Sequence, residues 1–311
     1  MDQAESLRQL VRSKRGSKQA PKEEDTREDY GHYTTTKVIT VASGKGGVGK
    51  SNFTVNLAIE LSKMGNRVMI LDADLGLANV DIIMGINPKF NLTHLIKEEK
   101  DIKDIITETE YGVKLIASGS GVKELVNMSN QQREKFILKL SEIEDMVDIL
   151  LIDTGAGISK NTLSFIYAAD YTIVITTPEP TALMDAYGLI KVASSGKKSV
   201  ALKLVVNMVS SKDEAKEIAS RVILLSRRFL NIFVESYGYI YRDRSVLNSV
   251  MAQKPFAAMF PDSRATACVR EIAKKVSARF VKENEKLIEQ ETPEATGIGG
   301  VFKKVFDLFT K

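Results

Sequence analysis

The chain alternates short, mostly apolar runs with longer stretches of helical spacing. The apolar runs lie at residues 38–41, 67–71, 113–117, 148–153, 171–176, 202–207 and 233–240. Apolar residues recur at helical spacing over 56–61, 181–194 and 262–288. Continuous apolar strands separated by helices are typical of a parallel sheet that is covered on both faces. The pattern therefore predicts an α/β fold with a largely parallel central sheet flanked by helices.

Two segments at the ends of the chain depart from this pattern. The segment before the first apolar run contains a polar, mostly acidic stretch at 22–29, which is typical of a flexible tether. A polar linker follows the last long helical stretch and leads to a short amphipathic stretch at the end of the chain. We therefore expect an arm at 1–36, one domain at 37–288, and a linker with a terminal helix at 289–311.

Composition narrows the class of protein further. The 311 residues are 43% hydrophobic and 27% charged, with a formal net charge of +4, which is typical of a globular domain and gives no indication of a dedicated nucleic-acid binder. Cys268 is the single cysteine, so a disulfide framework or a cysteine-ligated metal site within one chain is excluded. No signal peptide and no apolar run of membrane-spanning length is present, so we expect a cytoplasmic protein.

A glycine-rich stretch lies between the first apolar run and the first helical stretch. Residues 43–51 read S-G-K-G-G-V-G-K-S and contain the G-x-x-x-x-G-K-[ST] pattern of a phosphate-binding loop. Glycines let backbone N–H groups approach phosphate oxygens, and the following helix N-terminus adds free donors. Lys50 is expected to neutralise the outer phosphates and Ser51 to ligate Mg²⁺. The predicted nucleotide contacts here are Gly44, Lys45, Gly46, Gly47, Val48, Gly49, Lys50, Ser51 and Asn52.

Carboxylates follow two of the predicted strands. Asp72 and Asp74 come directly after strand 67–71, and Asp153 ends the run at 148–153. The carboxyl ends of parallel strands meet at the ligand-binding edge of an α/β sheet, where acids beside a phosphate loop are costly without a cation. Mg²⁺ is the natural cation, and an apolar strand ending in an acid has the geometry of a Walker B motif.

The loop carries a further lysine, Lys45, directly after its first glycine. The form K-G-G-V-G-K-S resembles the deviant Walker A loop of the MinD/ParA ATPases. The resemblance implies an ATP-dependent homodimer in which Lys45 contacts the phosphates bound by the partner subunit. It also implies that Lys45, Lys50 and Asp74 are the catalytic residues, with Asp74 orienting the attacking water. Ser51, Asp72 and Asp153 would then surround the Mg²⁺ ion.

Two further segments match motifs of the same family. Residues 72–85 resemble its switch I, D-x-D-x-G-x-x-N-x-D, and residues 153–157 resemble its switch II, D-x-x-x-G. By the resemblance, the amide of Asn207 contacts the adenine edge, and Asp243 is a second candidate near the base. Asn207 is not part of a guanine-specific N-K-x-D sequence, which favours ATP over GTP. The proline that many relatives have near Tyr241 and that packs against the base is absent, which leaves this wall of the adenine pocket open; stacking of Tyr241 on the base is the alternative.

The first residues carry a pattern of their own. Asp2 can cap a short helix with apolar residues at helical spacing, although such a segment is also typical of a frayed terminus. The sequence D-Q-A-x-x-L-R resembles the activation helix of the flagellar branch of MinD-like ATPases, which docks on the flagellar signal-recognition-type GTPase FlhF. The residues that carry this resemblance, and the predicted partner contacts, are Asp2, Gln3, Ala4, Leu7 and Arg8.

The last residues predict an amphipathic helix with basic residues on its polar side. Its length over 298–309 is about 17 Å, too short to span a bilayer but suited to an anionic membrane surface. The alternative is a helix folded back on its own domain. MinD-like ATPases carry a similar membrane-targeting tail. The predicted membrane contacts are Ile298, Val301, Phe302, Val305, Phe306 and Phe309.

Together these motifs predict a flagellar MinD-like ATPase that binds ATP and Mg²⁺. By the resemblance, its ATP-bound dimer attaches to the cytoplasmic face of the membrane, and it acts with FlhF and proteins of the flagellar switch complex, the C-ring, to set flagellar number and placement. A septum-site MinD and a DNA-binding ParA-type partition protein are the alternatives. The arm argues against the first, and the tail and modest charge argue against the second.

Overall fold

The computed structural model describes residues 36–74, 79–119, 128–196, 200–290 and 298–309. All of these residues belong to one compact unit, Tyr33–Lys311. The predicted arm at 1–36, apart from Thr36, lies outside the described residues.

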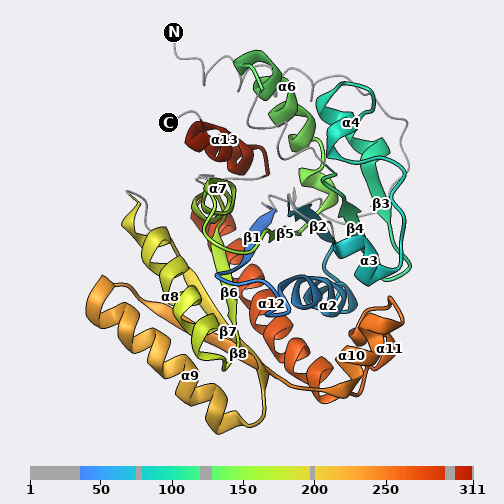
Figure 1. The fold of residues 1–311 in the computed structure, drawn as a ribbon. Coiled ribbons are helices and arrows are strands. Elements are labelled where there is room, and N and C mark those ends of the chain that lie inside the picture. Colours follow the sequence, from blue (N-terminus) through green and yellow to red (C-terminus); the bar gives the residue numbers. More distant parts are fainter. Residues whose placement is uncertain (1–35, 75–78, 120–127, 197–199, 291–297, 310–311) are drawn as a thin grey trace. The chain divides into compact units, whose positions relative to one another are not determined.

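An eight-stranded sheet forms the centre of this unit (Figure 1). Its order is β3-β4-β2-β5-β1-β6-β7-β8, and every neighbouring pair is parallel except β3 and β4. The predicted α/β class and largely parallel sheet are therefore confirmed. The strands are β1 (Lys37–Ser43), β2 (Val68–Ala73), β3 (Ile106–Glu108), β4 (Val113–Ile116), β5 (Ile149–Thr154), β6 (Tyr171–Thr176), β7 (Leu202–Val209) and β8 (Val234–Tyr241).

Each apolar run of the sequence forms one strand, whereas the short edge strand β3 was not predicted. Its sequence, I-T-E, has one apolar residue, and pairing with β4 rather than hydrophobic periodicity defines it. The central strands are buried along almost their whole length, as expected for a sheet covered on both faces. In the register of the sheet Asp153 pairs with Val41 and with Asp72. This register brings the loop after β1 and the acids of β2 and β5 to one edge.

Helices cover both faces of the sheet. The α-helices are α2 (Lys50–Lys63), α3 (Val80–Met84), α4 (Leu92–Ile96), α6 (Asn130–Ser141), α7 (Lys160–Ala168), α8 (Pro180–Ser195), α9 (Lys212–Leu225), α10 (Arg244–Met251), α11 (Phe256–Met259), α12 (Arg264–Gln290) and α13 (Ile298–Phe309). Single turns are η1 (Ile102–Ile105), η2 (Glu144–Met146) and η3 (Ser226–Leu230). One face packs against α2 and α12, and the other packs against α7, α8 and α9 together with α6 and α13.

A buried carboxylate fixes α2 to α12. The side chain of Glu60 in α2 is 1% exposed and accepts hydrogen bonds from Lys63 at 2.7 Å and from Arg270 of α12 at 2.7 Å. The amide of Asn56 also accepts a hydrogen bond from the Ala257 N–H at 2.7 Å. Because both partners of Glu60 are cations, its burial is compensated, and the helix that follows the phosphate loop is held in place.

The terminal helix α13 packs beside α6 and α7 (Figure 1). The rings of Phe302 and Phe306 contact Phe136 edge-to-face at centroid distances of 5.7 and 5.8 Å. At the start of α13, the Gly299 N–H donates to the carboxylate of Glu144 in η2 at 2.8 Å. The apolar residues of α13 whose side chains are described are buried in this core: Ile298, Val301, Phe302, Val305 and Phe306.

In the structure the predicted membrane helix packs against protein, whereas we expected its apolar face to contact a membrane. The helix at 298–309 is formed, but its apolar face is covered by α6 and α7 rather than left open, as in the alternative of a helix folded back on its domain. The side chain of Phe309 lies outside the described ones. Contact with a membrane remains a prediction, and it requires α13 to leave this position.

Candidate functional site

The phosphate loop lies at the carboxyl end of β1 and leads into α2. Gly47 and Gly49 have φ angles of 80° and 87°, in the left-handed region that favours glycine. Gly44 lies so close to α8 that a Cβ would be 2.2 Å from the Asp185 carbonyl oxygen. Among the described residues, the N–H groups of Gly46, Gly47 and Gly49 donate no backbone hydrogen bond. A glycine-lined turn with free donors at a helix N-terminus fits a phosphate group.

Asp153 at the end of β5 is the centre of a buried polar cluster below the loop. Its carboxylate is fully buried and lies 2.9 Å from the Lys50 ammonium group. The Ser51 hydroxyl donates to it at 2.6 Å, and the Thr54 hydroxyl donates at 2.9 Å. The structure thus brings Lys50, Ser51 and Asp153 together as predicted. Thr54 was missed, because a threonine one helical turn after Lys50 carries no signal of its own in the sequence.

Asp72 lies beside this cluster on the neighbouring strand. Its side chain is 1% exposed and accepts hydrogen bonds from the Asp74 N–H at 3.1 Å and the Val80 N–H at 3.4 Å. Burial, followed by repulsion from Asp153, raises the pKa of Asp72 to about 7. A second positive charge at this position would stabilise the ionised carboxylate.

Asp74 is half-buried and lies against the segment that follows β5. A Cβ at Gly155 would be 3.3 Å from Asp74 Oδ1, so a glycine at 155 gives the carboxylate room. The same segment is fixed to the phosphate loop by the Gly157 N–H, which donates to the Ser43 carbonyl at 2.9 Å. The two predicted switch segments therefore meet next to the loop, with Asp74 at their junction. The role of Gly155 was not predicted from the sequence.

Lys45 is held by residues at the start of α8. Its ammonium group lies 2.9 Å from Glu179 Oε2 and donates to the Thr181 hydroxyl at 3.0 Å. The interaction with Lys45 lowers the pKa of the Glu179 carboxylate. The side chain of Lys45 is 38% exposed and that of Glu179 is 63% exposed, so this ion pair is weak and exchangeable. Lys45 is thus accessible, and its contact with a partner subunit stays a prediction.

Asn207 at the end of β7 braces the phosphate loop. Its amide nitrogen donates to the Val48 carbonyl at 2.8 Å, and its amide oxygen accepts from the Met208 N–H at 2.8 Å. A Cβ at Gly49 would be 2.4 Å from that amide nitrogen, so the loop and Asn207 fit closely. The predicted contact with the adenine edge would therefore require this amide to exchange its present hydrogen bonds.

Asp243 has a structural role that the sequence prediction did not include. One carboxylate oxygen accepts from the Ser245 N–H at 2.9 Å and from the Ser245 hydroxyl at 2.8 Å, and the other accepts from the Ala265 N–H at 3.1 Å. Asp243 thus caps α10 and links it to α12. The neighbouring Tyr241 ring is covered by the Arg264 guanidinium at 3.8 Å, and stacking of Tyr241 on a base stays a prediction.

These residues fit a nucleotide with Mg²⁺. Mg²⁺ is bound in proteins by one or two carboxylates, a hydroxyl and phosphate oxygens, and the Asp72, Asp153 and Ser51 side chains supply this set. Burial and the neighbouring Asp153 raise the pKa of Asp72, so a divalent cation held by the two carboxylates would favour its ionised form. Within the described part of the chain, three or more His, Cys, Asp or Glu side chains are nowhere grouped as a metal cage. Such a cage is not needed where phosphates complete the coordination.

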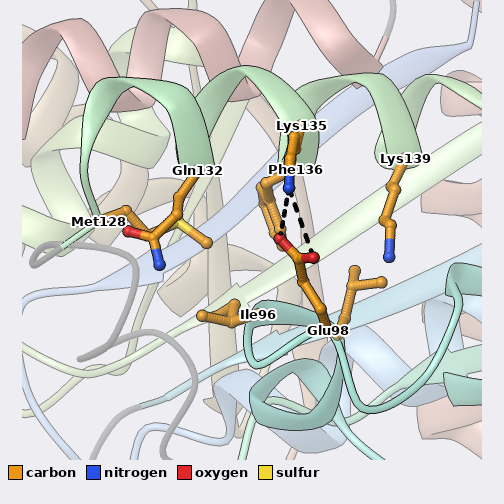
Figure 2. Close-up of a pocket in the computed structure, with 8 residues that line it drawn as sticks. Ile96, Glu98, Met128, Gln132, Lys135, Phe136 and Lys139 are labelled. Atoms are coloured by element: carbon orange, nitrogen blue, oxygen red, sulfur yellow. Dashed lines mark hydrogen bonds and ion pairs between the residues drawn. The ribbon is translucent and has the colours of Figure 1, made fainter.

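A small cavity between α4 and α6 is separate from this site (Figure 2). Ile96 and Phe136 form its apolar floor, and the Lys135 ammonium group donates to Glu98 at 3.0 Å across its rim. None of the residues that line the cavity belongs to the phosphate loop or the switch segments.

None of the described helices has the length and apolar character needed to cross a membrane.

Comparison with known families matches residues 34–277 to ParA, described as NUBPL iron-transfer P-loop NTPase. The antiactivator FleN of Pseudomonas aeruginosa is 37% identical over 242 residues, which cover 78% of this chain and 86% of FleN. The flagellum site-determining protein YlxH of Helicobacter pylori is 34% identical over 239 residues, which cover 76% of this chain and 81% of YlxH.

Among solved structures, the septum site-determining protein MinD of Pyrococcus horikoshii, complexed with Mg-ADP, is similar in fold. The TM-score is 0.62 at 22% sequence identity, and the match covers 78% of this chain and 96% of that structure. At this identity the likeness shows the fold alone.

Proposed function

Because the chain belongs to the ParA/MinD family of P-loop ATPases, we propose that it is a MinD-like ATPase that regulates the number and placement of bacterial flagella. Two relatives, the antiactivator FleN and the flagellum site-determining protein YlxH, match more than three quarters of the chain. The observation that carries the proposal is the convergence of Lys45, Lys50, Asp74 and Asp153 around one phosphate loop at the carboxyl edge of the sheet.

In this proposal the chain binds ATP and Mg²⁺ at the loop. The N–H groups of the loop and the Lys50 ammonium group would hold the phosphates. To do so, Lys50 would break its ion pair with Asp153 and form one with the phosphates. Mg²⁺, held by Ser51 with Asp72 and Asp153 nearby, would neutralise charge on the outer phosphates. Asp74 would orient the attacking water, since it lies between the two switch segments rather than among the metal ligands.

ATP would also join two copies of the chain. Lys45 would leave Glu179 and Thr181 and contact the phosphates of the partner subunit, which contributes positive charge to the transition state as an arginine finger does. The exposed ion pair with Glu179 is weak enough to be exchanged for a phosphate contact. Each active site would therefore be complete only in the dimer.

Membrane attachment would depend on α13. In the described structure its apolar face is buried, so a monomer with α13 in this position offers little apolar surface to lipid. We propose that α13 leaves α6 and α7 in the ATP-bound dimer, and that two released helices then bind an anionic membrane together. Two linked binding elements raise avidity about 10²–10⁴-fold over one.

The proposed partners are FlhF and C-ring proteins. FlhF would bind the arm at Asp2, Gln3, Ala4, Leu7 and Arg8, which lie outside the described residues. The name of YlxH supports a flagellar role over a septal one. A synthetic peptide of residues 1–20 is expected to stimulate GTP hydrolysis by FlhF, and the same peptide with Gln3 replaced by alanine is the matched control. A peptide that fails to stimulate FlhF, together with wild-type stimulation by a protein lacking residues 1–20, would contradict this assignment.

A further inference from the structure

The helix α10 exposes three of its four apolar side chains to solvent, and the fourth, Val246, packs against the core. Leu247 is 60% exposed, Val250 is 42% exposed and Met251 is 77% exposed, and Ser249 is the buried residue of this helix. Helices at a protein surface normally turn their apolar residues toward the core. An ordered helix that presents its apolar residues outward instead is typical of an interaction surface.

The helix is nevertheless held firmly at both ends. Asp243 caps its first turn and links it to α12 through the Ala265 N–H. Beyond the last turn, the Lys254 N–H donates to the Ser249 carbonyl at 3.0 Å. These bonds, together with Val246, which packs against the core, fix α10 without using Leu247, Val250 or Met251. The packing of the domain therefore does not explain why these three side chains are apolar.

Basic residues flank the apolar ones. Arg244 and Lys254 are exposed at the two ends of α10, and neither forms an ion pair with any other residue of the described chain. Over residues 241–260 the sequence contains Asp243 as its single acid, and that carboxylate is already engaged in the helix cap. We call Arg244, Leu247, Val250, Met251 and Lys254 the α10 surface.

We propose that the α10 surface is a docking site for an acidic amphipathic segment of a partner protein. Leu247 and Met251, one helical turn apart, would contact the apolar side of the segment, and its carboxylates would pair with Arg244 and Lys254. A second copy of this chain using the same face would bring two sets of cations together without an exposed acid to pair with them. Charge complementarity therefore favours an acidic partner over self-association.

The position of the α10 surface connects docking to the nucleotide site. The C-terminal end of α3 touches the turn after α10, because a Cβ at Gly85 would lie 2.6 Å from the Gln253 carbonyl oxygen. At its other end α3 begins at Val80, whose N–H donates to Asp72. A partner on α10 thus lies one short helix away from the predicted Mg²⁺ site. Its effect on hydrolysis rests on the proposed function, whereas the docking itself does not.

The test is selection of peptides from a randomised display library on the full-length protein, with counter-selection on the Met251→Glu variant. The enriched peptides are expected to be acidic, with apolar residues three or four positions apart. Their affinity is expected to fall at least about tenfold with Met251→Glu or Arg244→Glu and to be retained with Arg244→Lys. Leu224→Glu, at an exposed apolar residue of α9, is the matched control.

Three results would overturn the proposal. The first is that no peptide is enriched, or that the enriched peptides are basic or bind Met251→Glu equally well. The second is loss of sedimentation with phosphatidylglycerol vesicles in Met251→Glu, which would assign the α10 surface to lipid. The third is nucleotide-free self-association of the wild type that Leu247→Glu abolishes. Peptide binding without any change in ATP turnover would leave the docking site standing and remove only its connection to hydrolysis.

Discussion

At the scale of single residues, two acids that stand two positions apart have different surroundings. Asp72 is buried beside Asp153, whereas Asp74 is half-buried and lies at the backbone of Gly155. The first environment suits a ligand of a cation, and the second suits a group that contacts a water molecule. Each assignment leads to a different expected result on substitution.

For Asp72 we predict a pH-dependent stability of the nucleotide-free protein. Its pKa is raised from 3.8 to about 7, so the folded state keeps a proton that the unfolded state releases above pH 4. The free energy of unfolding therefore falls as pH rises toward 7, and at pH 8 the folded protein carries an ionised buried carboxylate. Asp72→Asn should raise the melting temperature at pH 8 and leave it nearly unchanged below pH 4, measured by calorimetry without Mg²⁺.

The matched control for Asp72 is Asp213→Asn, because the Asp213 side chain is 93% exposed and should show no such dependence. Equal shifts of the Asp72→Asn variant at both pH values would contradict the raised pKa.

For Asp74 we predict a loss of turnover without a loss of binding. Asp74→Ala should lower the rate of phosphate release by about 10²-fold or more, because water positioning contributes in the transition state, while ATP binding and dimer formation persist. Phosphate release and light scattering with ATP measure the two properties. Asp213→Ala, at an acid of α9 whose side chain is 93% exposed, should hydrolyse ATP at the wild-type rate. Wild-type turnover in Asp74→Ala would move the role to another residue.

At the scale of elements, α13 shows what a sequence pattern can and cannot determine. The spacing of its apolar residues correctly predicted a helix at 298–309 with one apolar face. It could not determine whether lipid or protein covers that face, since both are apolar and the groove at Phe136 and Phe165 is built from distant residues. The strands other than β3, and the phosphate loop, were predictable because each is encoded locally.

Side-chain contacts across elements were the part of the site that the sequence did not predict. Glu179, which holds Lys45, and Thr54, which donates to Asp153, are common residue types whose neighbours are set by the register of the sheet and the rotation of a helix. Asn207 was identified, but its position against Val48 depends on how closely β7 approaches the loop.

For α13 we predict that Glu144 controls release. Glu144→Ala removes the acceptor of the Gly299 N–H, and the loss of such a cap costs about 0.5–2 kcal/mol, which shifts α13 toward release. If the whole of this free energy acts on the packing of α13 against the domain, the released fraction should rise about 2- to 30-fold. Sedimentation of the nucleotide-free protein with anionic vesicles should increase accordingly. Glu142→Ala, at an exposed neighbour, is the control.

A second variant separates release from membrane binding. Lys303 is exposed on the polar side of α13, so Lys303→Glu should leave packing unchanged and weaken binding to anionic vesicles. Unchanged sedimentation of Glu144→Ala, with Lys303→Glu also without effect, would show that α13 is a permanent part of the core.

At the scale of the whole molecule, we propose that ATP binding, dimer formation and membrane attachment are linked. The elements involved lie at opposite ends of the parallel strands. The phosphate loop follows the carboxyl end of β1, whereas η2, which holds the start of α13, directly precedes β5. A dimer that forms at the first end must therefore alter contacts at the second if it is to release α13. The central claim in this account is that each active site is completed by Lys45 of the partner subunit.

Mixing two inactive variants, with phosphate release as the readout, tests this claim most directly. In a mixed dimer the Lys45→Ala subunit keeps its own Asp74 and receives Lys45 from an Asp74→Ala partner, so one complete site is restored. With Asp74→Ala in excess, turnover per Lys45→Ala subunit should approach the wild-type value per site, although each variant alone is inactive. If Lys45 acts on the nucleotide of its own subunit, no mixture will recover activity, and that result would contradict the account.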